Sequence, residues 1–148
     1  LLPGVLYDTT PFRMKYGDVL VEPKLIYTKL TDKVNATFVS AHPRNNMRLE
    51  GTFLTVDKRS AATGEWETLF TDADWETKFF WHRDSKLDSL LGRSYATIEW
   101  SVSDINGNCN WGTYRIRHFG TSKSLFTNPK FKNFSGSTRD FQVTCGRN

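Results

Sequence analysis

The sequence predicts an all-β fold, and three observations support that prediction. First, short segments alternate apolar and polar residues with a period of two, which is the pattern of a strand with one buried face. Second, turn-forming clusters such as residues 104–108 separate these segments, and no long run keeps a helical period. Third, 14% of the 148 residues are aromatic, including eleven Phe and five Trp, and aromatic residues favour strands. About seven or eight short strands at this spacing are typical of an immunoglobulin-like β-sandwich.

The chain divides into an N-terminal segment and one domain. Residues 1–16 contain Pro3, Gly4 and Pro11 and show no sustained period, so they are predicted to be a linker. Residues 17–148 are predicted to form a single β-sandwich domain, because a chain of this length can bury a core.

Four strands are predicted in the first part of this domain. In the segment Lys33–Ser40, the side chains of Val34, Ala36 and Phe38 share one face, and Asn35 lies on the other. The remaining three are short apolar or aromatic segments, namely Gly51–Val56, Trp66–Phe70 and Thr77–His82.

Three further strands are predicted toward the C-terminus. The clearest is Tyr95–Val102, in which one face consists of Ala96, Ile98, Trp100 and Val102. The same alternation is found in residues 114–118 and in residues 141–145.

The two cysteines lie near the last two of these strands. Cys109 precedes the strand at residues 114–118, and Cys145 ends the strand at residues 141–145. If those strands pair antiparallel, both cysteines fall at the same end of the sheet, where a disulfide is geometrically reasonable. Two free thiols are the alternative that the sequence leaves open.

Two N-x-[ST] sequences, at Asn35 and Asn133, are candidate glycosylation sites. Asn35 lies on the face of its strand that the alternation points outward, where a glycan would meet water. Together with the cysteine pair, these sites favour the secretory pathway and an extracellular or cell-surface location. The first four residues lack the basic segment and cleavage pattern of a signal peptide, so we expect a mature form or a fragment of a longer protein.

Charge and hydropathy argue against two kinds of function. Twenty Lys and Arg against sixteen Asp and Glu give a formal net charge of +4, but the basic residues are scattered along the chain. A mixed, solvated surface is expected, with no nucleic-acid partner. No apolar stretch approaches the roughly 18 residues that a membrane-spanning helix needs.

The sequence contains no recognisable catalytic motif. The three histidines, His42, His82 and His118, are far apart and form no zinc motif such as H-E-x-x-H. No nucleophile motif of the G-x-S-x-G type occurs, and residues 136–138 are predicted to lie in a turn. We therefore expect no reaction centre in this chain.

An acidic cluster is the strongest candidate binding site. Asp72, Asp74 and Thr77 place two carboxylates and a hydroxyl close together, just before a predicted strand. Oxygen ligands suit hard cations, here Mg²⁺ or Ca²⁺. The spacing differs from an EF-hand, because Arg83 stands where the bidentate Glu belongs. By residue type alone, a solvated acidic turn without a metal is the simpler interpretation.

Several multi-residue blocks resemble, in the same order, the C-terminal domain of the neutral (neutral/alkaline, non-lysosomal) ceramidases. The resemblance covers essentially the whole chain, and its most specific block is Tyr-Arg-Ile-Arg-His-Phe-Gly at residues 114–120. The other matching blocks are residues 12–20, 52–56, 72–82, 96–100 and 134–138.

The resemblance implies a function for the parent protein. Neutral ceramidases are zinc-dependent amidases that split ceramide into sphingosine and a fatty acid, and their zinc ligands and nucleophilic serine lie in a large N-terminal domain. None of those residues matches this chain, so the chain alone is expected to be inactive. The family's C-terminal domain is an immunoglobulin-like sandwich that packs against the catalytic domain and holds Mg²⁺ or Ca²⁺. Its ligands match Asp72, Asp74 and Thr77, which makes a structural cation the preferred interpretation.

Three functions follow from these observations. The first is an accessory domain that supports a ceramidase catalytic domain and its approach to ceramide at a membrane surface. The second is a free-standing secreted binding module, lectin-like or adhesive, whose exposed aromatic residues contact sugar or protein. The third is a calcium-dependent membrane module, which would need several carboxylate loops, whereas the sequence offers one.

Overall fold

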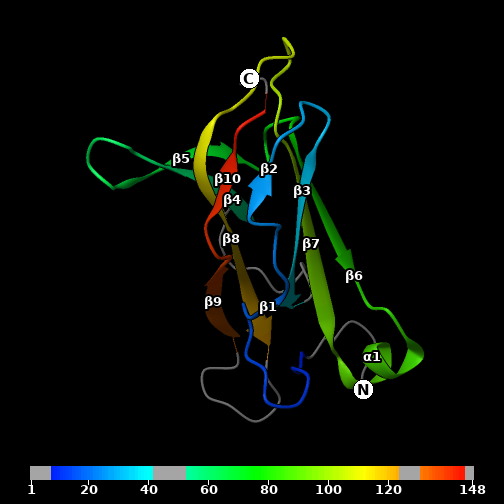
Figure 1. Ribbon diagram of the computed structural model, residues 1–148. Helices are drawn as coiled ribbons and strands as arrows, with labels where there is room; N and C mark the ends of the chain where they lie inside the picture. Colours follow the sequence, from blue (N-terminus) through cyan, green and yellow to red (C-terminus); the bar gives the residue numbers. More distant parts are fainter. Residues whose placement is uncertain (1–7, 42–52, 124–130, 146–148) are drawn as a thin grey trace.

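The computed structural model describes residues 8–41, 53–123 and 131–145. In these parts of the chain nearly all regular structure is β, which confirms the all-β prediction (Figure 1). The elements are β1 (Val19–Val21), β2 (Ile26–Tyr27), β3 (Lys33–Ser40), β4 (Leu54–Arg59), β5 (Trp66–Thr71), β6 (Thr77–His82), α1 (Lys86–Leu91), β7 (Ser94–Ser101), β8 (Gly112–Lys123), β9 (Phe131–Ser137) and β10 (Phe141–Val143).

The strands form two sheets that share one core. One sheet has four strands in the order β1-β3-β7-β6, and the other has the order β2-β10-β8-β4-β5, with β9 also pairing with β8. Neighbouring strands are antiparallel, except that β10 runs parallel to β2. The long strand β8 organises the larger sheet, because β10 pairs with its first residues and β9 with its last.

The core confirms the alternation that the sequence predicts for the longer strands. The side chains that point between the sheets are fully or almost fully buried in β3, β7 and β8. Trp100 of β7 is the largest of these side chains, and its ring lies 4.7 Å from the ring of Tyr114 and 5.6 Å from that of Phe70. Burying each such side chain contributes about 1.5–3 kcal/mol, so this central cluster holds the two sheets together.

Of residues 136–138, predicted as a turn, the first two instead end strand β9, so that prediction is wrong for them. Gly136 pairs with His118, and its backbone lies directly against Gly17. A Cβ atom on Gly136 would come within 1.8 Å of the Gly17 carbonyl oxygen, so the glycine is required here by close backbone contact. Thr138 then joins β9 to β10, because its backbone N–H donates to the Ile116 carbonyl and its hydroxyl accepts from the Ile116 N–H.

The short helix α1 was not predicted from the sequence. Its N-cap is Ser85, whose hydroxyl accepts a hydrogen bond from the Asp88 N–H, and the left-handed residue Gly92 ends it. These capping residues were its sequence signature, but six residues are too few to show a helical period. Among the described residues, no helix is long and apolar enough to cross a membrane.

The last part of the predicted linker lies against the sheets. Asp8 is buried, its N–H donates to the Lys123 carbonyl, and its carboxylate accepts from the Lys123 N–H. Tyr16 lies 5.3 Å from the ring of Phe134 in β9. Residues 1–7 fall outside the described residues, and the predicted boundary at residue 16 stays a prediction.

Candidate functional site

The acidic cluster forms the connection between the two sheets. Residues 72–76 join β5, at the edge of the larger sheet, to β6, at the edge of the smaller one. Trp75 in this turn is 59% exposed, whereas Thr77 at the start of β6 is buried. The sequence-predicted ligands therefore lie where one turn links the two layers.

Oxygen atoms gather around the Thr77 hydroxyl. Its Oγ1 lies 2.6 Å from the Thr71 carbonyl oxygen and 2.8 Å from the Asp74 carbonyl oxygen. A hydroxyl has one proton, so it can donate to only one of these two oxygens at a time. The Asp74 carboxylate accepts a hydrogen bond from the Thr71 N–H at 2.8 Å, which holds it in the same turn.

Asp72 connects this turn to the start of β4. Its carboxylate accepts a hydrogen bond of 2.9 Å from the N–H of Phe53. Phe53 stacks on Phe79 of β6, with ring centroids 5.0 Å apart. The turn is thus tied to the strands on both sides of the sandwich.

The turn contains oxygen atoms of the type that hard cations prefer. Two carboxylates, one hydroxyl and two main-chain carbonyl groups are oxygen ligands of the kind that Mg²⁺ and Ca²⁺ take. No group of three or more His, Cys, Asp or Glu side chains that could hold a metal is found within the described residues. A site with two carboxylates and a threonine does not belong to that type, so the cation at Asp72, Asp74 and Thr77 stays a prediction.

His118 lies in the core, next to the same segment. Its Nδ1 lies 2.8 Å from the Phe53 carbonyl oxygen and its Nε2 lies 2.8 Å from the Ser40 hydroxyl. Rings of Phe38 and Phe79 pack at 5.4 and 5.7 Å. Burial disfavours the charged imidazolium and lowers the pKa of His118 to about 4, although the hydrogen bond to Phe53 opposes the shift. His118 is therefore a neutral core residue with both ring nitrogens bonded.

The other histidines supply no zinc set in the described structure. His82 at the end of β6 is hydrogen-bonded to the Asp84 carboxylate through Nδ1 and to the Thr97 hydroxyl through Nε2. His42 lies outside the described residues. Both described histidines are thus held by groups of the domain itself.

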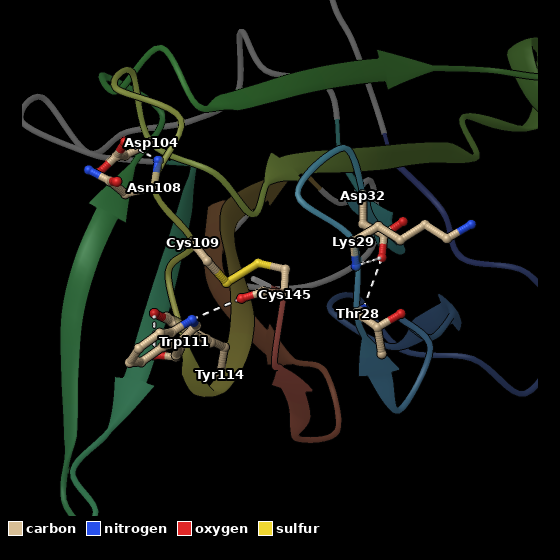
Figure 2. Close-up of a disulfide and its surroundings, with 9 residues drawn as sticks. All are labelled: Thr28, Lys29, Asp32, Asp104, Asn108, Cys109, Trp111, Tyr114 and Cys145. Atoms are coloured by element: carbon tan, nitrogen blue, oxygen red, sulfur yellow. Dashed lines mark hydrogen bonds between the residues drawn. A yellow bond between two sulfur atoms is a disulfide. The ribbon is translucent and has the colours of Figure 1, made fainter. Parts of the chain in front are cut away.

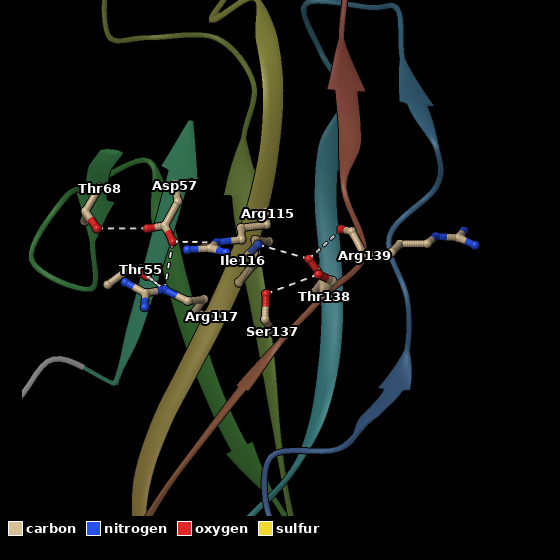
Figure 3. Close-up of polar contacts among 9 residues, drawn as sticks. All are labelled: Thr55, Asp57, Thr68, Arg115, Ile116, Arg117, Ser137, Thr138 and Arg139. Atoms are coloured by element: carbon tan, nitrogen blue, oxygen red, sulfur yellow. Dashed lines mark hydrogen bonds and ion pairs between the residues drawn. The ribbon is translucent and has the colours of Figure 1, made fainter. Parts of the chain in front are cut away.

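A buried carboxylate on the outer face of the larger sheet was missed by the sequence analysis. The Asp57 carboxylate lies 2.9 Å from Arg115 Nε and 2.7 Å from Arg117 Nε, and it accepts a hydrogen bond from Thr68 (Figure 3). Asp57 is 1% exposed, and a buried carboxylate needs a compensating charge. The two guanidinium groups supply that charge. This explains the alternating arginines of the block at residues 114–120: Tyr and Ile point into the core and Arg points to Asp57.

Comparison with known families identifies the family of the chain. A model of the family "Neutral/alkaline non-lysosomal ceramidase, C-terminal" matches residues 1–143. The chain belongs to this family.

Full-length ceramidases and solved ceramidase structures are similar to the chain. The neutral ceramidase of Oryza sativa subsp. japonica is 41% identical over 144 residues, which are 97% of this chain and 17% of that protein. The neutral ceramidase of Pseudomonas aeruginosa is 38% identical over 95% of this chain and 20% of its own length. The crystal structure of the Pseudomonas aeruginosa enzyme matches with a TM-score of 0.81, at 37% identity, over 95% of this chain and 21% of that one. The chain thus spans about a fifth of the relatives it matches.

In this ceramidase domain the two cysteines are joined by a disulfide. Figure 2 shows Cys109, in the loop before β8, bonded to Cys145, which follows β10, with the Cα atoms 5.7 Å apart. Strands β8 and β10 pair antiparallel, the arrangement on which the sequence argument depended. Both glycosylation candidates lie on strands: Asn35 is exposed on β3, and Asn133 on β9 accepts a hydrogen bond from the Thr121 hydroxyl. Glycosylation at either site stays a prediction.

Proposed function

We propose that the chain is the accessory domain of a neutral ceramidase, a hydrolase that cleaves the amide bond of ceramide. The observation that supports this most strongly is the family match over residues 1–143, combined with relatives in which this region is about a fifth of the protein. In this proposal a separate catalytic domain supplies the zinc and the nucleophile. The present chain supports that domain at the membrane surface where ceramide lies, and it adds no catalytic group.

The domain is further proposed to be immunoglobulin-like and to act in the secretory pathway, outside the cell or at its surface. Two facing sheets, antiparallel except for the pairing of β2 with β10, agree with that plan. A disulfide is typical of oxidising compartments, and exposed sequon positions are accessible to glycosylation.

A Mg²⁺ or Ca²⁺ ion held by Asp72, Asp74 and Thr77 is proposed to stiffen the turn between β5 and β6. Three side chains leave the coordination sphere of either ion incomplete, so main-chain carbonyl groups, water or the catalytic domain would complete it. The ion would link the two sheets at a surface available to the neighbouring domain. It has no part in bond cleavage in this proposal.

Removing the carboxylate charges of the turn should abolish stabilisation by cations. When the free ion concentration is ten times the Kd of the site, binding should raise the free energy of unfolding by about 1.4 kcal/mol. Asp72→Asn and Asp74→Asn keep an oxygen that can accept the Phe53 and Thr71 N–H bonds but lose the charge, so neither variant should respond. The measurement is urea unfolding with and without millimolar Ca²⁺ or Mg²⁺.

Asp104→Asn is the matched control for this experiment. Asp104 also accepts main-chain hydrogen bonds within a turn, from Asn106 and Asn108, but lies outside the proposed site. This variant should respond to cations like the unmodified chain. If Ca²⁺ or Mg²⁺ stabilises the Asp72→Asn and Asp74→Asn variants as much as the unmodified chain, no cation binds at these carboxylates.

A chimeric enzyme tests the proposed function. The 148-residue chain replaces the matching fifth of the Pseudomonas aeruginosa neutral ceramidase, and hydrolysis of ceramide is measured. If the two domains are equivalent, the chimera should be a soluble ceramidase, whereas the Pseudomonas enzyme truncated before this region should lose activity. The isolated chain should release no fatty acid from ceramide.

Two results would contradict the proposal. One is a folded chimera that is as inactive as the truncated enzyme, and the other is ceramide hydrolysis by the isolated chain. The free-standing binding module is the less supported alternative, because the chain matches its relatives only as one part of a longer polypeptide.

A further inference from the structure

Trp111 is an exposed aromatic side chain whose position is fixed. It lies between the disulfide and β8, and its indole Nε1–H donates a hydrogen bond of 2.8 Å to the Cys145 carbonyl oxygen (Figure 2). The Tyr114 hydroxyl lies 3.3 Å from the Trp111 carbonyl oxygen, which fastens the backbone as well. Even so, 45% of Trp111 is exposed. A rigid exposed ring loses little conformational entropy when a ligand stacks on it.

Three surface hollows meet at Trp111. The first, with a volume of about 730 Å³, lies between Trp111 and the β4–β5 hairpin. The second, about 440 Å³, lies between Trp111, Leu30 and the loop at Asn108, and the third, about 250 Å³, extends along Gln142. The first two have volumes in the range of small-molecule sites, roughly 300–1,000 Å³.

The first hollow combines this ring with polar groups of both kinds. Lys58 and Arg59 are hydrogen-bond donors, Glu67 is an acceptor, and Thr113 carries a hydroxyl that is both. Lys58 is the register partner of Glu67 on β5, and Arg59 lies 4.0 Å from the Asp140 carboxylate, so each basic residue is matched by an acidic one. The lining is therefore close to neutral and rich in hydrogen-bonding groups.

Gly112 lines this hollow and leaves room for the side chain of Lys58. It has a φ of +141°, and a Cβ atom there would come within 2.7 Å of Lys58 Cε. The missing side chain lets the Lys58 stem cross the start of β8 and places its amine 5.9 Å from the Tyr114 ring centroid. The arrangement of Trp111 and Lys58 is thus set by the backbone.

We infer that Trp111 and the hollow beside the β4–β5 hairpin bind a neutral saccharide. A pyranose ring has an apolar C–H face, which stacks on an aromatic ring, and a rim of hydroxyl groups, which need both donors and acceptors. An anionic lipid headgroup would instead favour a surplus of cations, whereas here Lys58 and Arg59 are matched in number by Glu67 and Asp140. This inference goes beyond the accessory role in ceramide hydrolysis.

The test titrates the 148-residue chain with maltotriose, lactose and N-acetylchitotriose and measures binding by ligand-observed NMR. At least one of them should bind, and Trp111→Ala should weaken that binding about tenfold or more. Trp75→Ala is the matched control, because Trp75 is exposed but lies on the acidic turn. Lys58→Met keeps the indole ring of Trp111 but removes a hydrogen-bond donor, so it should still weaken binding severalfold. Near- and far-ultraviolet circular dichroism checks that each variant is folded.

Vesicles separate the two sources of such a sugar. If the ligand is a glycolipid headgroup, phosphatidylcholine vesicles that carry a lactosyl lipid should bind the chain through Trp111. If the ligand is a soluble oligosaccharide only, these vesicles should not bind. The inference is overturned if none of the three sugars and no lactosyl vesicle binds. It is also overturned if Trp111→Ala and Trp75→Ala behave alike, or if plain phosphatidylcholine vesicles bind through Trp111 without competition from sugar.

Discussion

Loss of the Cys109–Cys145 disulfide is expected to lower the free energy of unfolding by about 4 kcal/mol. The bond joins residues 36 positions apart, and closing a loop of this length removes entropy from the unfolded chain that corresponds to roughly that amount at 25 °C. Domains of this size are stable by only about 5–15 kcal/mol, so the reduced domain should be marginally stable. The bond also holds the loop that carries Trp111 against Cys145, so the loss should loosen that end first.

The measurement is urea unfolding of the oxidised chain and of the Cys109→Ser/Cys145→Ser variant. The midpoint of the variant should be lower, and a reductant should bring the unmodified chain to the same midpoint. Reductant should leave the variant unchanged, which controls for effects on other residues. Equal midpoints for the oxidised chain and the variant would show that the disulfide does not stabilise the fold.

The longer strands could be predicted because their faces have different surroundings. In β7, Ala96, Ile98 and Trp100 are fully buried and the residues between them are not, which is the alternation that the sequence displays. Strands β3 and β6 have the bounds that the sequence predicts. Such segments are recognisable because one face meets the core over several successive pairs of residues.

The short elements could not be predicted because their structure depends on distant partners. β1 and β2 are three and two residues long, too short to display a period. The end of β9 is predicted as a turn because it contains Ser and Gly, and only its pairing with β8 and the close contact of Gly136 with Gly17 explain those residues. Here tertiary contacts override local propensity.

The candidate site shows the same division. The sequence shows that Asp72, Asp74 and Thr77 carry oxygen side chains at close spacing, a set that suits a hard cation, although by residue type alone a solvated turn is the simpler interpretation. Their anchoring was not evident, since the Asp72 carboxylate is held by the N–H of Phe53, a residue 19 positions away. The pairing of Asp57 with two arginines of β8 depends in the same way on the register of β4 with β8.

Acidification is expected to destabilise the domain through His118. Burial lowers the pKa of His118 to about 4 in the folded state, against about 6.5 in the unfolded chain. Between these two values the unfolded state binds a proton that the folded state does not, so stability falls as the pH is lowered. The contribution of neutral His118 to the free energy of unfolding is complete above about pH 6.5. Most of it is lost by pH 4, a loss on the order of 3 kcal/mol.

The geometry explains why the folded state resists this proton. The two ring nitrogens of neutral His118 have one donor and one acceptor role, and the Phe53 carbonyl and the Ser40 hydroxyl satisfy both. An imidazolium would also need a second acceptor, which the Ser40 hydroxyl can become only by turning its own proton toward another group. The ring contacts are with Phe38, Phe79 and Phe134, so these neighbours offer no compensating negative charge.

His118→Gln isolates the contribution of this residue. Glutamine keeps a donor and an acceptor but does not titrate, so the variant should be less stable at pH 7 yet lose less stability between pH 7 and pH 4. Urea unfolding of both proteins across this range gives the difference in slope, in which the carboxylates common to both cancel. Parallel curves for the unmodified chain and His118→Gln would show that His118 does not govern the acid response.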